Sequence, residues 1–503
     1  MTLQEWLKLK NGTDIRGTAS EGVEGDRVTL TDDVVTTLSK AFYVWLQRRL
    51  NKKDVTVAVG YDSRISAPRL CACVQQGVTA CGGTVVVTGL SSTPSMFMLL
   101  QKPDFSCDGS VMLTASHLPF QKNGMKFFVK EGGLESSDIQ EIITLAFENS
   151  FPSGMGSVIH RSFMDEYCAD LVALTQRETG EAMPLLGKKI IVDAGNGAGG
   201  FYATKVLQPL GADTAGSQFL EPDGTFPNHI PNPENKDAMR SICDAVKAKG
   251  ADFGIIFDTD VDRAGAVDKD GKEINRNRLI ALISAILLKE HAGAYIVTDS
   301  VTSDGLASFI REHGGVHHRF KRGYKNVINE AKRLCDEGKY APLAIETSGH
   351  AALAENYFLD DGAYLVTKLL ISLARTAKQG KELSSLISDL PMPAEEREIR
   401  PTFTDPDSDF KTLGKRIIEE ITAWAESCEY ITLAPDNFEG VRMNFDKAHG
   451  NGWVLVRMSL HEPIMPINLE SEEVGGCQKL VKEIYGFLKG YKELNLTPFD
   501  KYL

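Results

Sequence analysis

Ser116 is the one nucleophile in the segment VMLTASHLPFQKNGMKFF, residues 111–128, where it follows an apolar strand-like run. His117 lies beside it and Lys126 follows downstream. A serine hydroxyl is a weak nucleophile, so this grouping indicates either covalent catalysis or a serine that carries a phosphoryl group stabilised by cations. Taken alone, such a string is more commonly a plain turn with a local hydrogen bond. A catalytic role for Ser116 is therefore supported only if other parts of the chain carry residues suited to the same reaction.

Three aspartates at alternate positions end a second apolar run. In ADFGIIFDTDVDRAGAVD, residues 251–268, they are Asp258, Asp260 and Asp262, and Arg263 follows at once. Carboxylates so close together repel one another unless a cation joins them, and Mg²⁺ prefers oxygen ligands. The spacing therefore predicts a magnesium site, with a solvated acidic turn as the alternative.

Two other interpretations of this aspartate run can be tested on the sequence. An EF-hand loop needs glycine at its sixth position and glutamate at its twelfth, where this chain has Arg263 and Lys269. A phosphatase of the haloacid dehalogenase type expects Thr or Val two residues beyond the second aspartate, where Asp262 stands. The EF-hand fails on both positions, and the phosphatase stays open as a weaker alternative.

Two further strings contain groups suited to a sugar phosphate. IETSGHAALAENYFLDDGAY carries side chains that can bind hydroxyl groups, namely Glu346, Ser348 and His350. VLVRMSLHEP ends a strand with groups that can cradle a phosphate, namely Arg457, Ser459 and His461. Each string is weak alone, because polar turns are commonly plain surface and an arginine after a strand is commonly half of an exposed ion pair.

Strand-like runs must position these turns, and they alternate with helical stretches along the chain. The predicted strands lie at residues 55–62, 84–89, 109–115, 188–195, 253–258 and 294–299, and the clearest helices around 67–81, 236–249 and 277–290. This alternation predicts an α/β fold. We also expect Asn123 and Gly124 to lie in a loop before a strand that starts at Lys126, and residues 391–403, PMPAEEREIRPTF, to form a linker.

In their order along the chain, the four strings resemble loops of the α-D-phosphohexomutase superfamily, the phosphoglucomutases and phosphomannomutases. That family has a TASHNP-like phosphoserine loop, a DGDxDR-like metal loop, a GExSGH-like sugar loop and an RxSGTEP-like phosphate loop. Supporting strings extend the match over the chain: NGTDIRG at residues 11–17, GYDSR at 60–64, VDAGNGAGG at 192–200 and PDGTFPNHIPNPEN at 222–235.

The resemblance implies four domains around a central cleft, three related α/β domains and a smaller C-terminal α+β domain. The expected boundaries give a domain with the phosphoserine loop at 1–155, one with the metal loop at 156–273, one with the sugar loop at 274–395 and one with the phosphate loop at 396–503. The implied activity is that of a mutase that interconverts hexose 1-phosphate and hexose 6-phosphate, of glucose or mannose.

The resemblance also implies roles for individual residues. Phosphorylated Ser116 would donate its phosphoryl group, with hexose 1,6-bisphosphate as the intermediate and activator, and one Mg²⁺ would be held by Ser116 and the three aspartates. The expected catalytic set is Ser116, His117, Lys126, Arg16 and Arg263. The expected substrate ligands are Glu346, Ser348, His350, Arg457, Ser459 and His461.

Several positions depart from the family pattern. They are Leu118 in the serine loop, Thr259 in the metal loop, Ile345 before the sugar loop, Tyr324 where several relatives have His, and Leu460 with His461 in the phosphate loop. None removes a nominal ligand, and His461 could bind phosphate when protonated. The changes affect substrate identity most, so a phosphoglucosamine mutase, a Mg²⁺-dependent sugar phosphatase and a non-catalytic sugar-phosphate-binding relative remain alternatives.

Composition agrees with a large enzyme acting on a phosphosugar. The chain has 503 residues and a net charge of −13, which argues against nucleic acid or an anionic membrane as partner. No run approaches the ~18 to 20 apolar residues of a membrane span. The nine cysteines lack metal-site spacing and are expected to be reduced in a cytoplasmic protein, a monomer or a homodimer. The GxGxxG of residues 195–200 has no acidic strand end in the right place, so a dinucleotide enzyme is a remote alternative.

Overall fold

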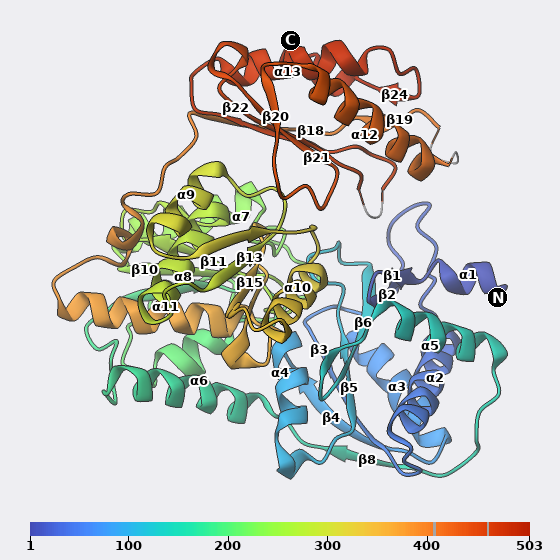
Figure 1. Ribbon diagram of the computed structural model, residues 1–503. Coiled ribbons are helices and arrows are strands. Elements are labelled where there is room, and N and C mark those ends of the chain that lie inside the picture. The colour runs from blue at the N-terminus through green and yellow to red at the C-terminus, as the bar shows by residue number, and fades with distance from the viewer. Residues whose placement is uncertain (406–408, 460–461) are drawn as a thin grey trace. The chain divides into compact units, whose positions relative to one another are not determined.

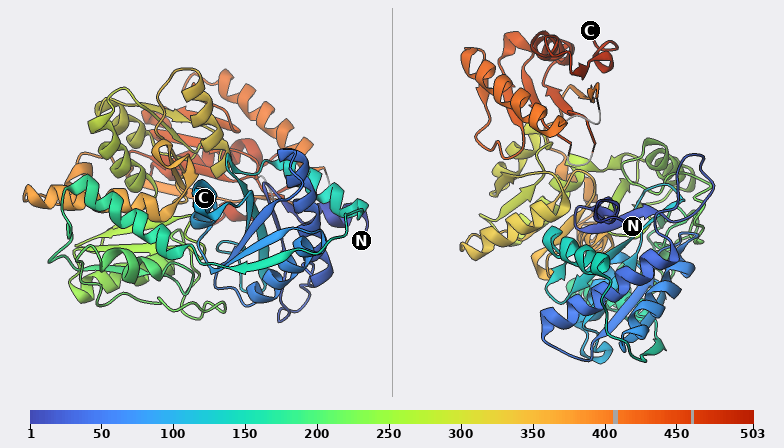
Figure 2. Two further views of the ribbon diagram at one scale, coloured as in Figure 1. Left: turned by 90° about the horizontal axis from the view of Figure 1, so that it is seen from below. Right: turned by 90° about the vertical axis from the view of Figure 1, so that its right-hand side faces the viewer.

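A computed structural model describes residues 1–405, 409–459 and 462–503 (Figures 1 and 2). The chain forms two compact units. Unit 1 contains Met1–Asn275 and Ser348–Ser385, and unit 2 contains Arg276–Thr347 and Leu386–Leu503. Within the described ranges, no helix has an apolar stretch long enough to cross a membrane.

The first sheet of unit 1 carries the serine loop between two antiparallel neighbours. In spatial order its strands are β1 (Lys10–Asn11), β2 (Asp14–Thr18), β6 (Lys122–Val129), β5 (Gly109–Leu113), β3 (Thr56–Tyr61), β4 (Thr84–Leu90) and β8 (Ser157–His160), with β7 (Gly132–Gly133) beside β6. The helices of this part are α1 (Leu3–Leu7), α2 (Asp32–Leu50), α3 (Ala67–Ala80), α4 (Thr93–Met98) and α5 (Ser136–Glu148). Because β5 is buried throughout, the loop that follows it begins deep in the protein.

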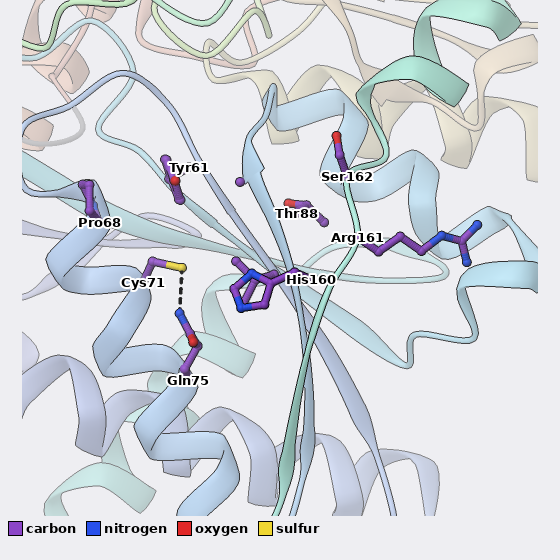
Figure 3. A pocket seen from close by; sticks show the side chains of 10 residues that line it. Tyr61, Pro68, Cys71, Gln75, Thr88, His160, Arg161 and Ser162 are labelled. Carbon is purple, nitrogen blue, oxygen red and sulfur yellow. Dashed lines mark hydrogen bonds between the residues drawn. The ribbon is translucent and has the colours of Figure 1, made fainter.

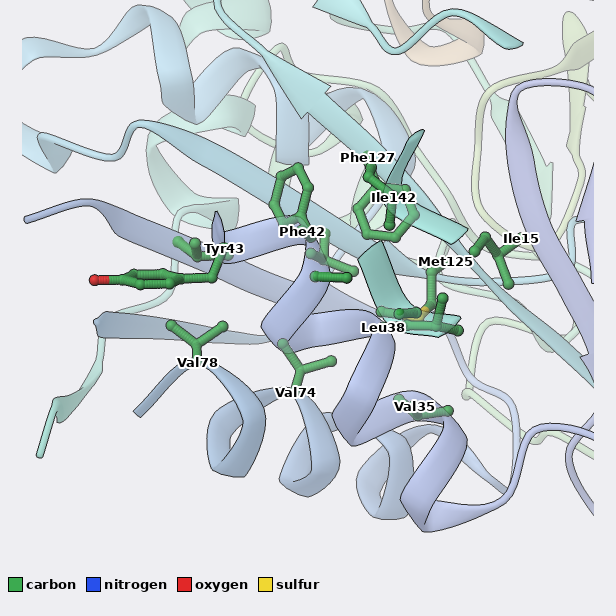
Figure 4. Packing of buried hydrophobic residues seen from close by; sticks show 14 of the residues in the cluster. Ile15, Val35, Leu38, Phe42, Tyr43, Val74, Val78, Met125, Phe127 and Ile142 are labelled. Atoms are coloured by element: carbon green, nitrogen blue, oxygen red, sulfur yellow. The ribbon is translucent and has the colours of Figure 1, made fainter. Parts of the chain in front are cut away.

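A hydrophobic core between these helices and the sheet holds β5 and β6 in place. Figure 4 shows Leu38 and Phe42 of α2 directed toward Val74 of α3 and Phe127 of β6. The rings of Phe42 and Phe127 lie with their centroids 4.7 Å apart. Each fully buried side chain of this size contributes roughly 1.5–3 kcal/mol, so the core fixes the strands that flank Ser116.

The second sheet of unit 1 carries the aspartate loop. Its order is β12 (Glu273–Ile274), β11 (Ala264–Asp268), β10 (Phe253–Phe257) and β9 (Ile190–Asp193), and the aspartate loop joins β10 to its antiparallel neighbour β11. Other elements of unit 1 are α6 (Met164–Thr179), a π-helix (Tyr202–Leu207), α7 (Lys236–Lys249), β16 (Ala351–Leu353), β17 (Leu359–Asp360) and α11 (Gly362–Lys378). β10 is buried at every position, which agrees with its uninterrupted apolar sequence.

Unit 2 begins with parallel strands and ends with an antiparallel sheet. The parallel strands are β14 (Val316–Arg319), β13 (Tyr295–Thr298) and β15 (Leu343–Ile345), with helices α8 (Arg276–Glu290), α9 (Asp304–Glu312) and α10 (Tyr324–Asp336). The antiparallel sheet has the order β18 (Glu395–Ile399), β23 (Ile467–Ser471), β22 (Gly452–Val456), β21 (Val441–Phe445) and β20 (Ile431–Leu433). Helices α12 (Phe410–Ser427) and α13 (Gly476–Leu488) cover one face of it, and β19 (Thr402–Phe403) pairs with β24 (Leu494–Asn495) (Figure 1).

The predicted strands and helices are present, and two local predictions are wrong. Asn123 and Gly124 lie inside β6, where they pair with Gly17 and Arg16 of β2. Residues 391–403 are no plain linker, because they contain β18 and β19. β18 is an edge strand, and most of its charged side chains face solvent. Its sequence is therefore as rich in charge as that of a linker.

Candidate active site in unit 1 and ligand groups in unit 2

Ser116 is held in a strained and buried loop. Its side chain is 1% exposed and its φ is 52°, in the left-handed region that non-glycine residues avoid. The backbone N–H of Ser116 donates to the hydroxyl of Thr114 at 2.8 Å. A strained residue persists where its surroundings over-determine it, and such residues cluster at functional sites. Ser116 is thus a positioned side chain and not a plain turn serine.

Arg64 fixes the loop by binding its carbonyl groups. The guanidinium is buried and donates to the carbonyl oxygens of four loop residues, namely Ser116, Leu118 at 2.7 Å, Pro119 at 2.8 Å and Lys122 at 2.9 Å. Its Nε lies 3.4 Å from a carboxylate oxygen of Asp62. The sequence did not predict this role, because GYDSR at residues 60–64 served only as a string supporting the family resemblance. A charged pair at the end of a buried strand was the available signal.

The hydroxyl of Ser116 contacts three other residues of unit 1. It donates to Oδ2 of Asp258 at 3.0 Å and accepts from Nη2 of Arg263 at 3.2 Å. Nδ1 of His117 lies 3.3 Å from the same oxygen. Burial, with Arg263 and Arg16 nearby, lowers the pKa of His117 to about 2. His117 is therefore neutral and supplies hydrogen bonds rather than positive charge.

The three predicted aspartates converge, and each keeps an oxygen toward the others. Ligand atoms of Asp258, Asp260 and Asp262 lie within 4.8 Å of one another. Lys126 donates to Oδ2 of Asp260 at 2.9 Å and to Oδ2 of Asp262 at 2.5 Å. Oδ1 of Asp260 and Oδ1 of Asp262 are buried and accept no hydrogen bond from any described residue. Buried carboxylate oxygens without donors fit a hard divalent cation.

The electrostatics of the loop point the same way. Burial raises the pKa of Asp258 well above its usual value, and the carboxylates of Asp262 and Asp260 add to this. Burial also opposes ionisation of Asp262, but Lys126, His350 and Arg263 together outweigh burial and lower the pKa of Asp262. The pKa of Lys126 is raised in turn, since the two carboxylates outweigh the effect of burial. A divalent cation would relieve the repulsion that remains among the three aspartates.

The glycine-rich segment at residues 195–200 packs directly on the metal loop. A Cβ on Gly197 would lie 2.6 Å from the carbonyl oxygen of Thr259, and the N–H of Ala198 donates to that oxygen at 2.8 Å. Within the loop itself, Val261 has a φ of 68°, which is unusual for a β-branched residue. Gly197 is thus accounted for by close approach to the aspartate loop, and a Cβ on Gly200 would meet the carbonyl oxygen of Leu220.

Thr93 is a second residue that the sequence analysis missed. Its hydroxyl donates to Oδ2 of Asp260 and its backbone N–H donates to the carbonyl oxygen of the same residue at 2.8 Å. Thr93 is 3% exposed and begins α4. No local signal marks this threonine, because its role depends on a contact between distant parts of the chain.

Arg16 and His350 lie beside these loops. Arg16 donates to the carbonyl oxygen of Ala115 at 3.1 Å, next to Ser116. Nδ1 of His350 binds Oδ2 of Asp360 and lies 4.0 Å from Oδ1 of Asp262. The preceding Gly349 has a φ of 94° and packs on β11. His350, predicted as a sugar ligand, is therefore also a neighbour of the metal loop.

Ser348, the other predicted sugar ligand of unit 1, is 6% exposed, and no described residue binds its hydroxyl.

Among the predicted ligand groups of unit 2, Glu346 and Arg457 are buried and Ser459 is partly exposed. Glu346 accepts a hydrogen bond from the N–H of Gly323 at 2.6 Å. Arg457 is 6% exposed, and its Nε has no hydrogen-bond partner among the described residues. The hydroxyl of Ser459 accepts from the N–H of Glu462 at 3.2 Å. Leu460 and His461, the strongest departures from the family pattern, lie outside the described residues.

A separate cavity of about 430 Å³ lies against α3, β3 and β4, and Figure 3 shows its lining. Cys71, Gln75 and His160 are among the residues around it. Arg161 is engaged elsewhere, since it donates to the carbonyl oxygen of Asp104 and stacks on the ring of Phe105 at 3.7 Å. The cavity offers no cluster of chemistry comparable to the serine and metal loops.

Comparison with known proteins gives matches over most of the chain. Family descriptions named phosphoglucomutase/phosphomannomutase, alpha/beta/alpha domains I, II and III, match residues 8–153, 165–271 and 275–393. A phosphoglucomutase of Neisseria gonorrhoeae is 30% identical over 474 residues, covering 93% of this chain and 94% of that protein. A phosphomannomutase/phosphoglucomutase of Pseudomonas aeruginosa is 31% identical over 480 residues, covering 95% and 96%.

Solved structures agree in fold. A phosphoglucomutase/phosphomannomutase family protein of Burkholderia thailandensis has a TM-score of 0.80 at 27% identity, covering 97% of this chain and 98% of that one. A more distant fold relative, the N-acetylphosphoglucosamine mutase of Aspergillus fumigatus, was solved with GlcNAc-6P and magnesium; it has a TM-score of 0.55 at 11% identity, covering 95% and 94%.

Proposed function

Because the chain belongs to the phosphoglucomutase/phosphomannomutase family of isomerases, we propose that it interconverts the 1-phosphate and 6-phosphate of a hexose, glucose or mannose. The observation that carries this proposal is the meeting of Ser116 with Asp258, from segments far apart in the chain, beside two carboxylates with free oxygens. Intact Ser116 and all three aspartates argue against a non-catalytic binding protein, and a phosphatase would be distinguished by net release of inorganic phosphate.

In the proposed reaction Ser116 carries the phosphoryl group that is passed to a hydroxyl of the substrate. Arg263 contacts its oxygen and would stabilise charge on the phosphoryl group as it moves. His117 would orient the serine. Lys126 would fix the carboxylates of Asp260 and Asp262 through its hydrogen bonds to them. Arg16, bound to the adjacent carbonyl, would add positive charge at the same place.

Mg²⁺ is the proposed metal, which the carboxylates of Asp258, Asp260 and Asp262 and the phosphoserine would hold. When bound, it supplies positive charge that stabilises the transferred phosphoryl group. A hexose 1,6-bisphosphate is the proposed intermediate and activator, because the phosphate given up by Ser116 must be replaced by the one already on the substrate. The chemistry of oxygen donors, without cysteine or several histidines, favours Mg²⁺ over softer metals.

Substrate recognition is proposed for the remaining groups. Glu346, Ser348 and His350 would bind sugar hydroxyls, while Arg457 and Ser459 would bind the phosphate that is not transferred. His461 is proposed as a further phosphate ligand on sequence grounds. The domain boundaries at 155, 273 and 395 are proposed on the same grounds.

One assay tests the proposal. Glucose 1-phosphate and mannose 1-phosphate are incubated separately with the protein, Mg²⁺ and a catalytic amount of the 1,6-bisphosphate, and both the 6-phosphate product and inorganic phosphate are measured. We expect isomer formation with little free phosphate. Net release of phosphate would indicate a phosphatase, glucosamine 1-phosphate as the preferred substrate would indicate the third mutase class, and no turnover of any of them would reject the mutase function.

A further inference from the structure

A turn of the C-terminal sheet places a carboxylate against the arginine assigned to the substrate phosphate. Glu439 lies between β20 and β21, and its Oε1 is 3.7 Å from Nη1 of Arg457. Only 11% and 7% of the two side chains are exposed. An ion pair with so little water around it is screened less than a surface pair, so the contact restricts the guanidinium.

Gly440 explains how the carboxylate reaches this position. Its φ is 62°, and a Cβ there would lie 2.1 Å from the carbonyl oxygen of Val456 and 2.8 Å from Cα of Arg457. Only glycine permits so close an approach in this conformation. Val441, the next residue, pairs with Val456 in the antiparallel ladder. The backbone therefore places Glu439 beside Arg457 independently of the ion pair.

The second oxygen of Glu439 is held by residues that follow β13 and β14. Ser300 donates its hydroxyl to Oε2 at 2.6 Å, and Arg322 donates its backbone N–H to the same oxygen at 2.9 Å. The next N–H along the chain, that of Gly323, donates to Glu346. Two successive backbone N–H groups thus bind two different carboxylates. These contacts lead from the turn to the residue assigned to the sugar.

The rest of the Arg457 guanidinium remains available. Its Nε is buried and has no hydrogen-bond partner among the described residues, and its Nη1, which faces Glu439, makes a long contact with the carbonyl oxygen of Met458 at 3.5 Å. Burial lowers the pKa of Arg457, and Glu439 is the neighbour that opposes this most. Arginine has five N–H donors and binds phosphate with two of them in parallel, so a guanidinium held on one side by a carboxylate can still bind an ester on the other.

We propose that Glu439 is a positioning residue for substrate binding, which orients Arg457 toward a phosphate monoester and ties that orientation to the segment carrying Glu346. The inference rests on the proposed function, because it takes Arg457 as a phosphate ligand. The opposite role is that of an internal anion that occupies the phosphate site and competes with substrate. Loss of the carboxylate weakens binding in the first case and strengthens it in the second.

Calorimetric binding of glucose 1-phosphate distinguishes these roles. All variants are made in the Ser116→Ala background, where no phosphoryl transfer can occur. We expect Glu439→Gln to weaken binding about tenfold, which is the loss of one charge-assisted contact. The double variant Glu439→Gln/Arg457→Ala should bind no more weakly than Arg457→Ala alone, because Glu439 acts through Arg457. Glu426→Gln, an exposed position on α12, is the matched control and should bind as the background does.

Steady-state kinetics with Ser116 intact give a second readout. Glu439→Gln should raise KM about tenfold and leave kcat unchanged, because the contact concerns binding and not the transfer step. Ser300→Ala, which keeps every charge, should raise KM by a smaller factor, and it replaces Glu439→Gln if that variant melts at a lower temperature than the parent.

Tighter binding by Glu439→Gln, or additive losses in the double variant, would overturn the proposal. If Glu439→Gln binds normally while Arg457→Ala binds weakly, this inference alone is wrong. If Arg457→Ala itself binds glucose 1-phosphate normally, the assignment of the phosphate site in the proposed function is wrong, and the inference with it.

Discussion

Replacing Thr93 by valine tests the geometry of the metal loop with the smallest change the structure offers. The hydroxyl of Thr93 donates to Oδ2 of Asp260, while Oδ1 of that carboxylate has no donor among the described residues. Valine keeps the branched shape and removes only this donor. Asp260 would then be held on Oδ2 by Lys126 alone, and the direction of its free oxygen would be less well fixed.

The expected loss follows from the contacts that remain. A hydrogen bond to a charged group contributes about 1.5–3 kcal/mol. The lower end applies here, because Lys126 still holds the same oxygen and the N–H of Thr93 still binds the backbone of Asp260. Since about 1.4 kcal/mol is a factor of ten, Mg²⁺ should bind about tenfold more weakly. Loss of a residue that orients a metal ligand commonly has an effect of this size.

Calorimetric titration with Mg²⁺, and competition against Mn²⁺ followed by electron paramagnetic resonance, measure this affinity without reference to turnover. Thr93→Ser keeps the hydroxyl and should retain most of the affinity. Thr84→Val, at the start of β4, is the matched control for loss of a threonine hydroxyl elsewhere in the same unit. Thermal unfolding of all three variants shows whether the fold is preserved.

Two results would refute the reasoning at different points. If Thr93→Val binds Mg²⁺ normally while Asp260→Asn does not, Thr93 does not orient the carboxylate. If Asp260→Asn also binds normally, the metal does not use this loop.

Three further predictions concern other parts of the molecule. Ser116→Ala should lose the phosphate that intact-protein mass detects on the wild type and lower turnover by on the order of 10³-fold or more; near-normal turnover would reject the covalent mechanism. Gly197→Ala should lower the free energy of unfolding by roughly 1–3 kcal/mol and weaken Mg²⁺ binding, because its Cβ would meet Thr259. An unchanged free energy of unfolding and an unchanged Mg²⁺ affinity would show that the two segments accommodate the added methyl group. Burial raises the pKa of Glu470 from 4.5 to about 7 despite the charge of Arg442, so the folded state holds this proton more tightly than the unfolded state and stability falls as the pH rises from about 4.5 to about 7. The free energy of unfolding of Glu470→Gln, relative to that of the wild type, should therefore be higher above about pH 7 than in acid by up to about 3 kcal/mol. Urea unfolding at several pH values measures this difference, and the same pH dependence for both proteins would contradict the prediction.

Local sequence signals were sufficient to predict a strand or helix wherever residues that begin and end it are present. α7 occupies the predicted residues 236–249 because Asn235 caps its first N–H groups and Gly250 ends it in the left-handed conformation. The prediction that Asn123 and Gly124 lie in a loop was wrong, because contacts with other segments override the local signal. The dipeptide is a strong turn signal, but pairing with β2 and a hydrogen bond from Asn123 to Ser66 keep it in the strand.

For the candidate site, the sequence predicted only the residues that lie in recognisable motifs. Ser116 and Asp258 could be singled out from their own strings, and the family pattern implied that they meet. Thr93 and Glu439 could not be found in this way, because each acts through a contact with another segment of the chain, and the charged string GYDSR marked Arg64 without showing its partners. Such residues have ordinary local surroundings, and only the fold shows what they hold.

The departures from the family pattern fall into two physical classes. In unit 1, Leu118 and Thr259 replace expected residues, yet the contacts that fix their loops use backbone atoms: the carbonyl of Leu118 accepts from Arg64, and the carbonyl of Thr259 accepts from Ala198. A change of side chain at such positions leaves the loop in place.

The other departures lie in unit 2. They are Tyr324, Ile345, Leu460 and His461. Since the proposed nucleophile and metal ligands lie in unit 1, we expect its chemistry to be preserved, whereas these four positions of unit 2 depart from the family pattern. The reaction type should therefore follow the family, and the preferred hexose should follow the altered residues of unit 2. Exchange of Tyr324 for His should shift the ratio of kcat/KM between glucose 1-phosphate and mannose 1-phosphate while leaving phosphorylation of Ser116 unchanged. An unaltered ratio would show that this position does not contribute to the choice of sugar.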